Sequence, residues 1–267
     1  MGREISVAWG VKGHAEQLNG KNALVVEGMH MSTNRKLACA MVALSALTLM
    51  SQSASAGSID LCGGAAGWRA TWDPSLDGLV QIISPGPGCN NLANGLVFIE
   101  KAATFTQGPN INGVFPTIPI TFIQTANTIV NRIIIEDEII TNLTGSPWTD
   151  FHMDLIDSGD AFFDVANTAA SGGGGPIGFS ISPFTQAAFS NGNTTLDIWG
   201  GVVPHGMVWN PGSGASNGEL WIQVNPHDLS VQGAVPTVFT LKETPTPEPG
   251  SLVLLALGAA AVLRRVR

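Results

Sequence analysis

Short β-prone segments, separated by clusters of Gly, Pro, Asn and Ser, recur along the middle of the chain and limit its fold more than any other feature. Their spacing is typical of strands joined by turns, and alternating helical patterns of the βαβ kind are absent. In 218–225, for example, Leu220, Ile222 and Val224 share one face of an extended chain. We therefore predict an all-β, antiparallel β-sandwich of the jelly-roll or Ig-like kind. The predicted strands are 68–72, 78–84, 96–105, 118–124, 129–141, 150–156, 161–165, 177–181, 195–199, 219–224 and 237–241.

The longest predicted strand is interrupted by charge. Glu136, Asp137 and Glu138 separate its two β-branched stretches, which predicts either a β-bulge or a hairpin corner. The Gly-rich stretch 171–176 predicts a flexible surface loop. We do not interpret it as a domain boundary, because the apolar segments on either side are too few to build a separate core.

Residues 31–56 have the three parts of a secretory signal peptide. A basic start is followed by an apolar run up to residue 50, and Ala54 and Ala56 supply the small residues of a cleavage site. We interpret residues 1–30 as a mis-assigned start or a disordered extension. The sandwich is then expected to occupy 57–244, a length that suits one domain with its own core.

Residues 245–267 have a different character. A Pro-rich linker with Pro247, Glu248 and Pro249 precedes an apolar run, and an arginine cluster that includes Arg264 and Arg265 follows it. As a helix, the apolar run would span roughly 18 Å, well short of the roughly 30 Å hydrocarbon core of a bilayer. We therefore expect transient inner-membrane contact through this short apolar helix, with the arginines on the cytoplasmic side. The alternative is a short tail anchor helped by snorkelling arginines.

The order of Pro-Glu-Pro, apolar run and arginines resembles the PEP-CTERM sorting signal of Gram-negative bacteria. The resemblance implies recognition by an exosortase, placement at the cell surface or outside the cell, and an association with exopolysaccharide. The segment 142–155 is also similar to one found in secreted PEP-CTERM proteins, whose middle domains are β-sandwiches without an assigned activity. The expected partners are the exosortase, the secretion machinery and exopolysaccharide. The expected function is that of a surface or extracellular-matrix protein.

The charge of the middle region excludes one class of partner. Residues 57–250 contain 4 basic and 17 acidic side chains, which gives a net charge of −13. Such a surface repels phosphate backbones, so we do not expect nucleic-acid binding.

Cys62 and Cys89 are the two cysteines of the predicted domain. A signal peptide implies an oxidising compartment, and a disulfide between them is the expected state. In the loop-entropy model the bridge stabilises the domain by about 3 kcal/mol. Two free buried thiols are the alternative.

Aspartates are concentrated between residues 150 and 164. Asp154, Asp157 and Asp160 are candidate calcium ligands, because calcium prefers oxygen donors. Their spacing does not match an EF-hand loop, and a solvated turn is the alternative. No other cofactor is expected.

No motif in the sequence predicts catalysis. His152, His205 and His227 lack zinc-site spacing, and we interpret His152 as a hydrogen-bonded structural residue of a strand. No nucleophile elbow, phosphate-binding loop or catalytic cysteine motif occurs. We therefore predict no catalytic residue and no enzyme activity. Two alternatives remain: a carbohydrate-binding module that uses exposed tryptophans such as Trp221, and a glycosidase that uses two of the carboxylates.

Overall fold

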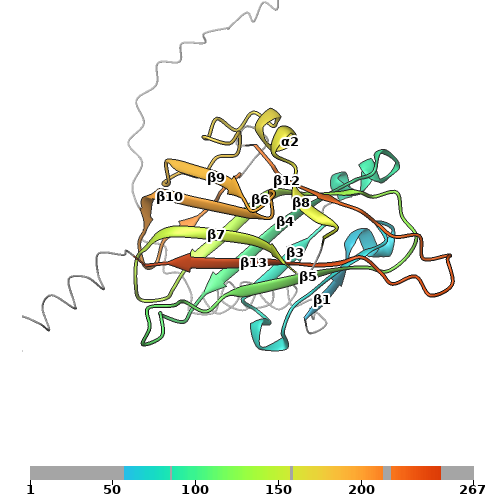
Figure 1. The fold of residues 1–267 in the computed structure, drawn as a ribbon. Helices are drawn as coiled ribbons and strands as arrows, with labels where there is room; N and C mark the ends of the chain where they lie inside the picture. The colour runs from blue at the N-terminus through green and yellow to red at the C-terminus, as the bar shows by residue number, and fades with distance from the viewer. Residues whose placement is uncertain (1–56, 85, 157–158, 213–217, 248–267) are drawn as a thin grey trace, which may run out of the picture. The chain divides into compact units, whose positions relative to one another are not determined.

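The computed structural model describes residues 57–84, 86–156, 159–212 and 218–247. Within these ranges the fold is mainly β, as predicted, and the strands form two sheets (Figure 1). The seven-stranded sheet has the order β1-β2-β5-β13-β7-β10-β9. The six-stranded sheet has the order β3-β4-β6-β12-β8, with β11 paired to β6. The strand bounds are β1 Ser58–Asp60, β2 Trp68–Thr71, β3 Val80–Ile83, β4 Leu96–Phe105, β5 Ile118–Gln124, β6 Arg132–Asn142, β7 Trp148–Ile156, β8 Ala161–Phe163, β9 Gln186–Ser190, β10 Thr195–Val203, β11 Val208–Trp209, β12 Leu220–Val224 and β13 Val238–Thr246.

Short helices connect some of the strands. They are η1 Leu61–Gly64, η2 Pro74–Leu76, η3 Gly86–Asn94 and α2 Val165–Ala170. No helix of the described ranges is long and apolar enough to cross a membrane. The predicted signal peptide and C-terminal apolar helix lie outside these ranges.

The prediction of purely antiparallel sheets is wrong for one pair, because β4 and β6 run parallel. The strand between them in sequence, β5, belongs to the other sheet, where it pairs with β2 and β13. The chain therefore leaves the six-stranded sheet after β4 and re-enters it in the same direction. This crossover is what a parallel pair requires, since a tight hairpin would have produced an antiparallel one.

The charged interruption of β6 forms a β-bulge. Of the two predicted alternatives, the bulge is confirmed and the hairpin corner is wrong. At Glu136 this strand has one residue more than its partner β4, since Ile135 pairs with Ile99 and Asp137 with Glu100. An extra residue reverses the alternation of faces. The residue after Asp137 consequently points into the core instead of towards solvent.

The carboxyl group of Glu136 should make stability depend on pH. Burial, followed by the negative charges of Glu219, Asp137 and Glu100, raises the pKa of Glu136 above its ordinary value of 4.5. Its contribution to stability is therefore complete below the unfolded pKa and is lost as the pH rises through the folded pKa. We expect Glu136→Gln to raise the melting temperature at about pH 7 and to leave it nearly unchanged at about pH 4. If Glu136→Gln shifts the melting temperature equally at both pH values, the raised pKa of Glu136 is not the cause.

One apolar core lies between the inner faces of the two sheets. The ring of Phe105, on β4, packs edge-on against that of Phe151, on β7, with centroids 5.9 Å apart. Phe151 also contacts Trp209, on β11, at 5.0 Å. Trp68, Trp148 and Trp209 are at most 1 % exposed. These three tryptophans are therefore core residues and cannot form a surface platform for sugars.

The last strand continues beyond the expected end of the domain at residue 244. Pro245 and Thr246 pair with Phe151 and Asp150 of β7, so two residues of the predicted linker belong to β13. Proline is tolerated here because the pairing of β13 with β5 has already ended at Glu243, and the missing N–H leaves no ladder bond unmade on that side. The sorting segment thus begins inside a strand that lies between two others in the sheet (Figure 1).

Candidate functional site

A crevice of about 620 Å³ opens where two short helices meet two loops. One wall comes from the residue after η1 and from η3, and the other comes from the β5–β6 and β12–β13 loops. A hollow of this volume is in the range of small-ligand sites. The lining residues are Ala65, Leu92, Ala93, Asn127, Thr128, Ile129, Val130, Pro226, His227 and Asp228.

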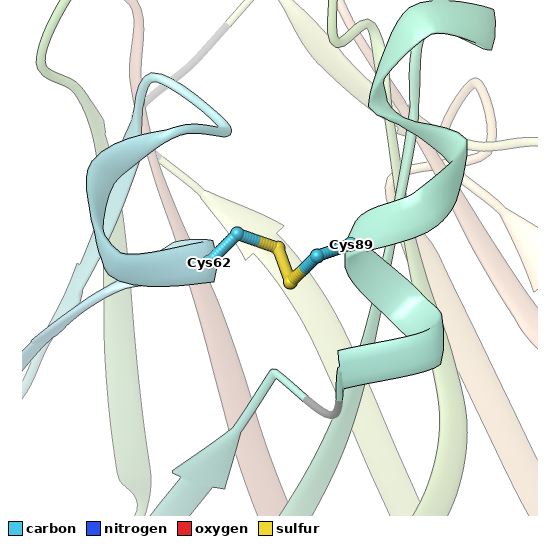
Figure 2. Close-up of a disulfide and its surroundings, with 2 residues drawn as sticks. All are labelled: Cys62 and Cys89. Carbon is cyan, nitrogen blue, oxygen red and sulfur yellow. A yellow bond between two sulfur atoms is a disulfide. The ribbon is translucent and has the colours of Figure 1, made fainter.

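A disulfide fixes the helical wall of this crevice. Cys62 of η1 and Cys89 of η3 are bonded, with Sγ atoms 2.09 Å and Cα atoms 5.7 Å apart (Figure 2). This is the pair expected from the sequence. Cys62 and Cys89 are each three residues before a lining residue, Ala65 and Leu92 respectively, so the bridge ties together the two segments that form this wall.

The side chain of Gln124, at the end of β5, holds the two crevice loops together. Its Oε1 accepts hydrogen bonds from the backbone N–H groups of His227 and Thr237, at 2.8 and 3.2 Å. Its Nε2 donates to the carbonyl oxygens of His227 and Ala126, at 2.6 and 3.1 Å. Gln124 is 1 % exposed, so these bonds form away from water. Both loops are therefore held in place by one buried amide.

Replacing Gln124 by leucine is expected to lower the free energy of unfolding by about 2 kcal/mol, because buried backbone groups lose their partners. Amide hydrogen exchange at His227 and Thr237 should accelerate more than exchange in the strand centres. Gln81→Leu on the exposed face of β3 is the matched control and should change neither quantity. Unchanged exchange at His227 in the Gln124 variant would show that this side chain does not hold the loops.

The β5–β6 loop is also fixed against the segment that follows η1. The Thr128 hydroxyl donates to the carbonyl oxygen of Ala66 at 2.9 Å, and the Trp68 indole N–H donates to that of Val130 at 3.1 Å. Gly67 has a φ of 70°, and a Cβ there would lie 2.7 Å from Thr128 Cβ. Only glycine therefore permits this close approach.

The chemistry of the crevice is mainly apolar with an acidic rim. His227 Nε2 lies 3.2 Å from Asp160, and its Nδ1 lies 2.9 Å from the carbonyl oxygen of Val235. Hydrogen bonds from the side chain and the backbone of Ser230 lower the pKa of Asp228. A rim of this kind favours a neutral ligand over an anionic one.

Two of the three candidate calcium ligands, Asp154 and Asp160, lie in the described ranges, and each has its own polar partner. Asp154 lies on β7 and accepts a hydrogen bond from Thr195 at 2.9 Å. Asp160 lies beside His227, and Asp157 falls outside the described ranges. Among the residues that the structure places, no group of three or more potential metal ligands comes together.

Asp164, from the same acidic segment, caps α2. Burial alone would raise its pKa, but hydrogen bonds from Asn167 and the nearby Arg132 hold the pKa below its ordinary value. The backbone N–H of Asn167 donates to Asp164 at 3.1 Å, which satisfies one free donor of the first helical turn.

His152 and His205 occupy surface positions away from the crevice. His152, on β7, has its Nδ1 2.7 Å from Asp197 on β10, and its side chain is 32 % exposed. His205 Nδ1 accepts a hydrogen bond from the backbone N–H of Gly145 at 3.0 Å. His152 is thus hydrogen-bonded within a strand, as expected.

An ion cluster in the core was not predicted from the sequence. Lys101 of β4 contacts Glu138 of β6 and, at 2.5 Å, Glu243 of β13. All three side chains are 0 % exposed, and we call them the buried triad. β4 alternates strictly between buried and half-buried residues, which places Lys101 on the core face. The alternation in β4 could have predicted from the sequence that Lys101 points into the core. The same could not be predicted for Glu138, because the bulge in β6 reverses the alternation before it.

Burial and the neighbouring charges shift the pKa values of Glu138 and Lys101 in the triad. Burial raises the pKa of Glu138 well above its ordinary value, and the neighbouring Glu243 adds to this effect against the opposing charge of Lys101. Burial would lower the pKa of Lys101, but Glu138 and Glu243 raise it above its ordinary value. The neutral arrangement is therefore one ammonium, one carboxylate and one protonated carboxyl group.

Residues 245–267 match the family model of the PEP-CTERM protein-sorting motif. The predicted sorting residues fall in this segment. Pro247 is in the described ranges, whereas Glu248, Pro249, Arg264 and Arg265 are not. Searches for similar curated proteins and for similar solved structures found no match. The match shows that residues 245–267 carry a PEP-CTERM sorting motif, which supports a PEP-CTERM protein; the status of an exosortase substrate follows from that family.

Proposed function

We propose that this protein is an exported, non-enzymatic surface or extracellular-matrix protein, processed by an exosortase and associated with exopolysaccharide or biofilm. The observation that carries the proposal is the sorting motif, which starts in the last strand of a disulfide-bridged domain. A disulfide in a small domain fits an oxidising compartment outside the cytoplasm. The two packed sheets fit a β-sandwich of the jelly-roll or Ig-like kind. This folded domain is the part of the protein that the sorting signal would deliver.

A non-catalytic role is supported by the positions of the ionisable groups. Glu138, whose pKa is raised well above its ordinary value by burial, belongs to a triad without solvent exposure, so a substrate could not reach it. His152 and His227 are each beside a carboxylate, but neither imidazole has a hydroxyl or thiol hydrogen-bonded to it among the described residues. The pairing of a nucleophile with a base, which covalent catalysis needs, is therefore missing from these positions.

The test of sorting compares the protein from its producing strain with a variant in which Pro247, Glu248 and Pro249 are alanine. We expect the natural protein to lose Arg264 to Arg267 and to reach the surface or the medium. The variant should keep its complete C-terminus and stay with the inner membrane. A natural protein that retains Arg267 and fractionates permanently with inner membranes would instead be a plainly anchored protein.

A second candidate function is carbohydrate binding in the crevice, favoured by its preformed loops, its volume and its acidic rim. Neutral fragments of the producer's exopolysaccharide are the probe, and binding is measured by titration calorimetry. Ala93→Trp, which fills the crevice, should abolish binding, whereas Ala188→Trp, on the exposed part of β9, should not. Equal binding by both variants would place the sugar elsewhere.

Calcium binding is tested separately by thermal unfolding. Millimolar calcium should raise the melting temperature if a site forms around Asp154, Asp157 and Asp160. The absence of any shift would remove the calcium-binding form of this second candidate.

A further inference from the structure

The buried triad joins three strands from both sheets. Lys101 and Glu138 are directly opposite each other in the parallel pair β4 and β6. Glu243 reaches them from β13, in the facing sheet. The Nζ atom of Lys101 touches a carboxylate oxygen of each glutamate. An amine and two carboxyl groups are thus in mutual contact, without any other residue between them.

The core residues that flank the triad along its strands are buried and apolar. Ile99 and Ala103 flank Lys101 on the core face of β4, and Leu241 flanks Glu243 on β13; each is at most 1 % exposed. In the described protein, the ammonium and the carboxylate oxygens have no hydrogen-bond partner outside the triad. Charges without solvent or additional donors are costly to keep. A reaction that removes them would be favoured by the site.

We propose that Lys101 and Glu138 condense to form an intramolecular amide bond that joins β4 to β6 covalently, with Glu243 as the proton carrier. The inference does not depend on the sorting function or on the crevice. It assigns a covalent modification to groups that the proposed function leaves unused.

The reaction balances within the triad. Lys101 first passes a proton from its ammonium group to the Glu243 carboxylate, which leaves a neutral amine and a neutral acid. The amine lone pair then attacks the carboxyl carbon of protonated Glu138, and a C–N bond forms. Glu243 transfers a proton from the nitrogen to the departing hydroxyl group, the C–O bond breaks, and water leaves. The products are a neutral amide, one water molecule and protonated Glu243, so that no charge stays in the core.

The position of Glu138 and its protonated form both indicate that Glu138, and not Glu243, supplies the carbonyl carbon of the amide. It is the register partner of Lys101 on the neighbouring strand, and the two side chains are in contact in the folded domain. Burial favours its protonated form, which is the electrophilic one. Glu243 comes from the other sheet and completes the site only when β13 has docked. Condensation should therefore follow closure of the two sheets.

Peptide mass spectrometry of the protein purified from its producing strain tests the proposal. After reduction, denaturation and digestion with trypsin and chymotrypsin, we expect a branched peptide that contains both Lys101 and Glu138. Its mass should be lower by one water molecule than the sum of the two linear peptides. Cleavage after Lys101 should also be lost, because trypsin does not act at an acylated lysine.

Two variants separate the roles within the triad. Glu243→Gln keeps the side-chain volume but cannot carry the proton, and it should yield unlinked peptides while circular dichroism shows a folded domain. Glu136→Gln, on the same strand at the bulge, is the matched control and should keep the link. Free Lys101 and Glu138 peptides from the natural protein would overturn the proposal. A branch between Lys101 and Glu243, or a link that persists in Glu243→Gln, would overturn the assignment of roles.

Discussion

Replacing Lys101 by methionine is expected to lower the free energy of unfolding by about 3–5 kcal/mol, since two buried carboxyl groups would lose the cation that contacts both of them. The free energy of unfolding should fall whether the side-chain nitrogen of Lys101 is an ammonium ion or part of an amide bond. Chemical denaturation followed by tryptophan fluorescence measures the change, because Trp68, Trp148 and Trp209 report on the core.

The control for this variant is Lys242→Met, on the outer face of β13. A half-exposed lysine contributes at most about 1 kcal/mol through surface charge, so this change should be small. Replacing all of Lys101, Glu138 and Glu243 by Met and Leu should restore much of the loss, because a packed apolar cluster removes the desolvation cost. If Lys101→Met unfolds at the same denaturant concentration as the natural protein, the triad is not a stabilising element.

Removal of the disulfide is the second large change. The variant with Cys62→Ser and Cys89→Ser should lose about 3 kcal/mol of stability, because the unfolded chain is no longer constrained by the loop. The two cysteines are 27 residues apart in sequence. Denaturation midpoints with and without reductant provide the measurement.

Reductant should shift the natural protein to the midpoint of the double serine variant and leave that variant unchanged. The helical wall of the crevice should loosen at the same time, and amide exchange at Leu92 and Ala93 should increase. A midpoint that reductant does not alter would mean that the bridge adds no net stability.

Local strand patterns were predicted well where alternation and burial coincide. The predicted strands at 96–105 and 118–124 have the bounds observed for β4 and β5. In both, every second residue is buried, and this pattern depends only on neighbouring residues in the chain. β9 was missed because it is an edge strand whose residues are exposed or half-buried.

The predicted strand at 177–181 is wrong, although its pattern is real. Phe179 and Ile181 are buried in the core, at 0 and 2 % exposure. The backbone here turns instead of pairing, with the Gly178 N–H donating to the Gly175 carbonyl oxygen at 3.1 Å. Gly178 also has a φ of 80°, which an extended strand does not contain. Alternating burial therefore does not establish a ladder of hydrogen bonds.

Sequence by itself determined the features that local chemistry encodes: the sorting motif, the main strands, the acidic charge and the candidate cysteine pair. Tertiary structure alone decided the parallel pairing of β4 and β6, the crevice held by Gln124, and the meeting of Lys101 with Glu138 and Glu243. The physical reason is that strand alternation is set by adjacent residues, whereas contacts between distant residues depend on which strands the topology places together. A bulge of one residue at Glu136 was enough to turn Glu138 from the surface into the core.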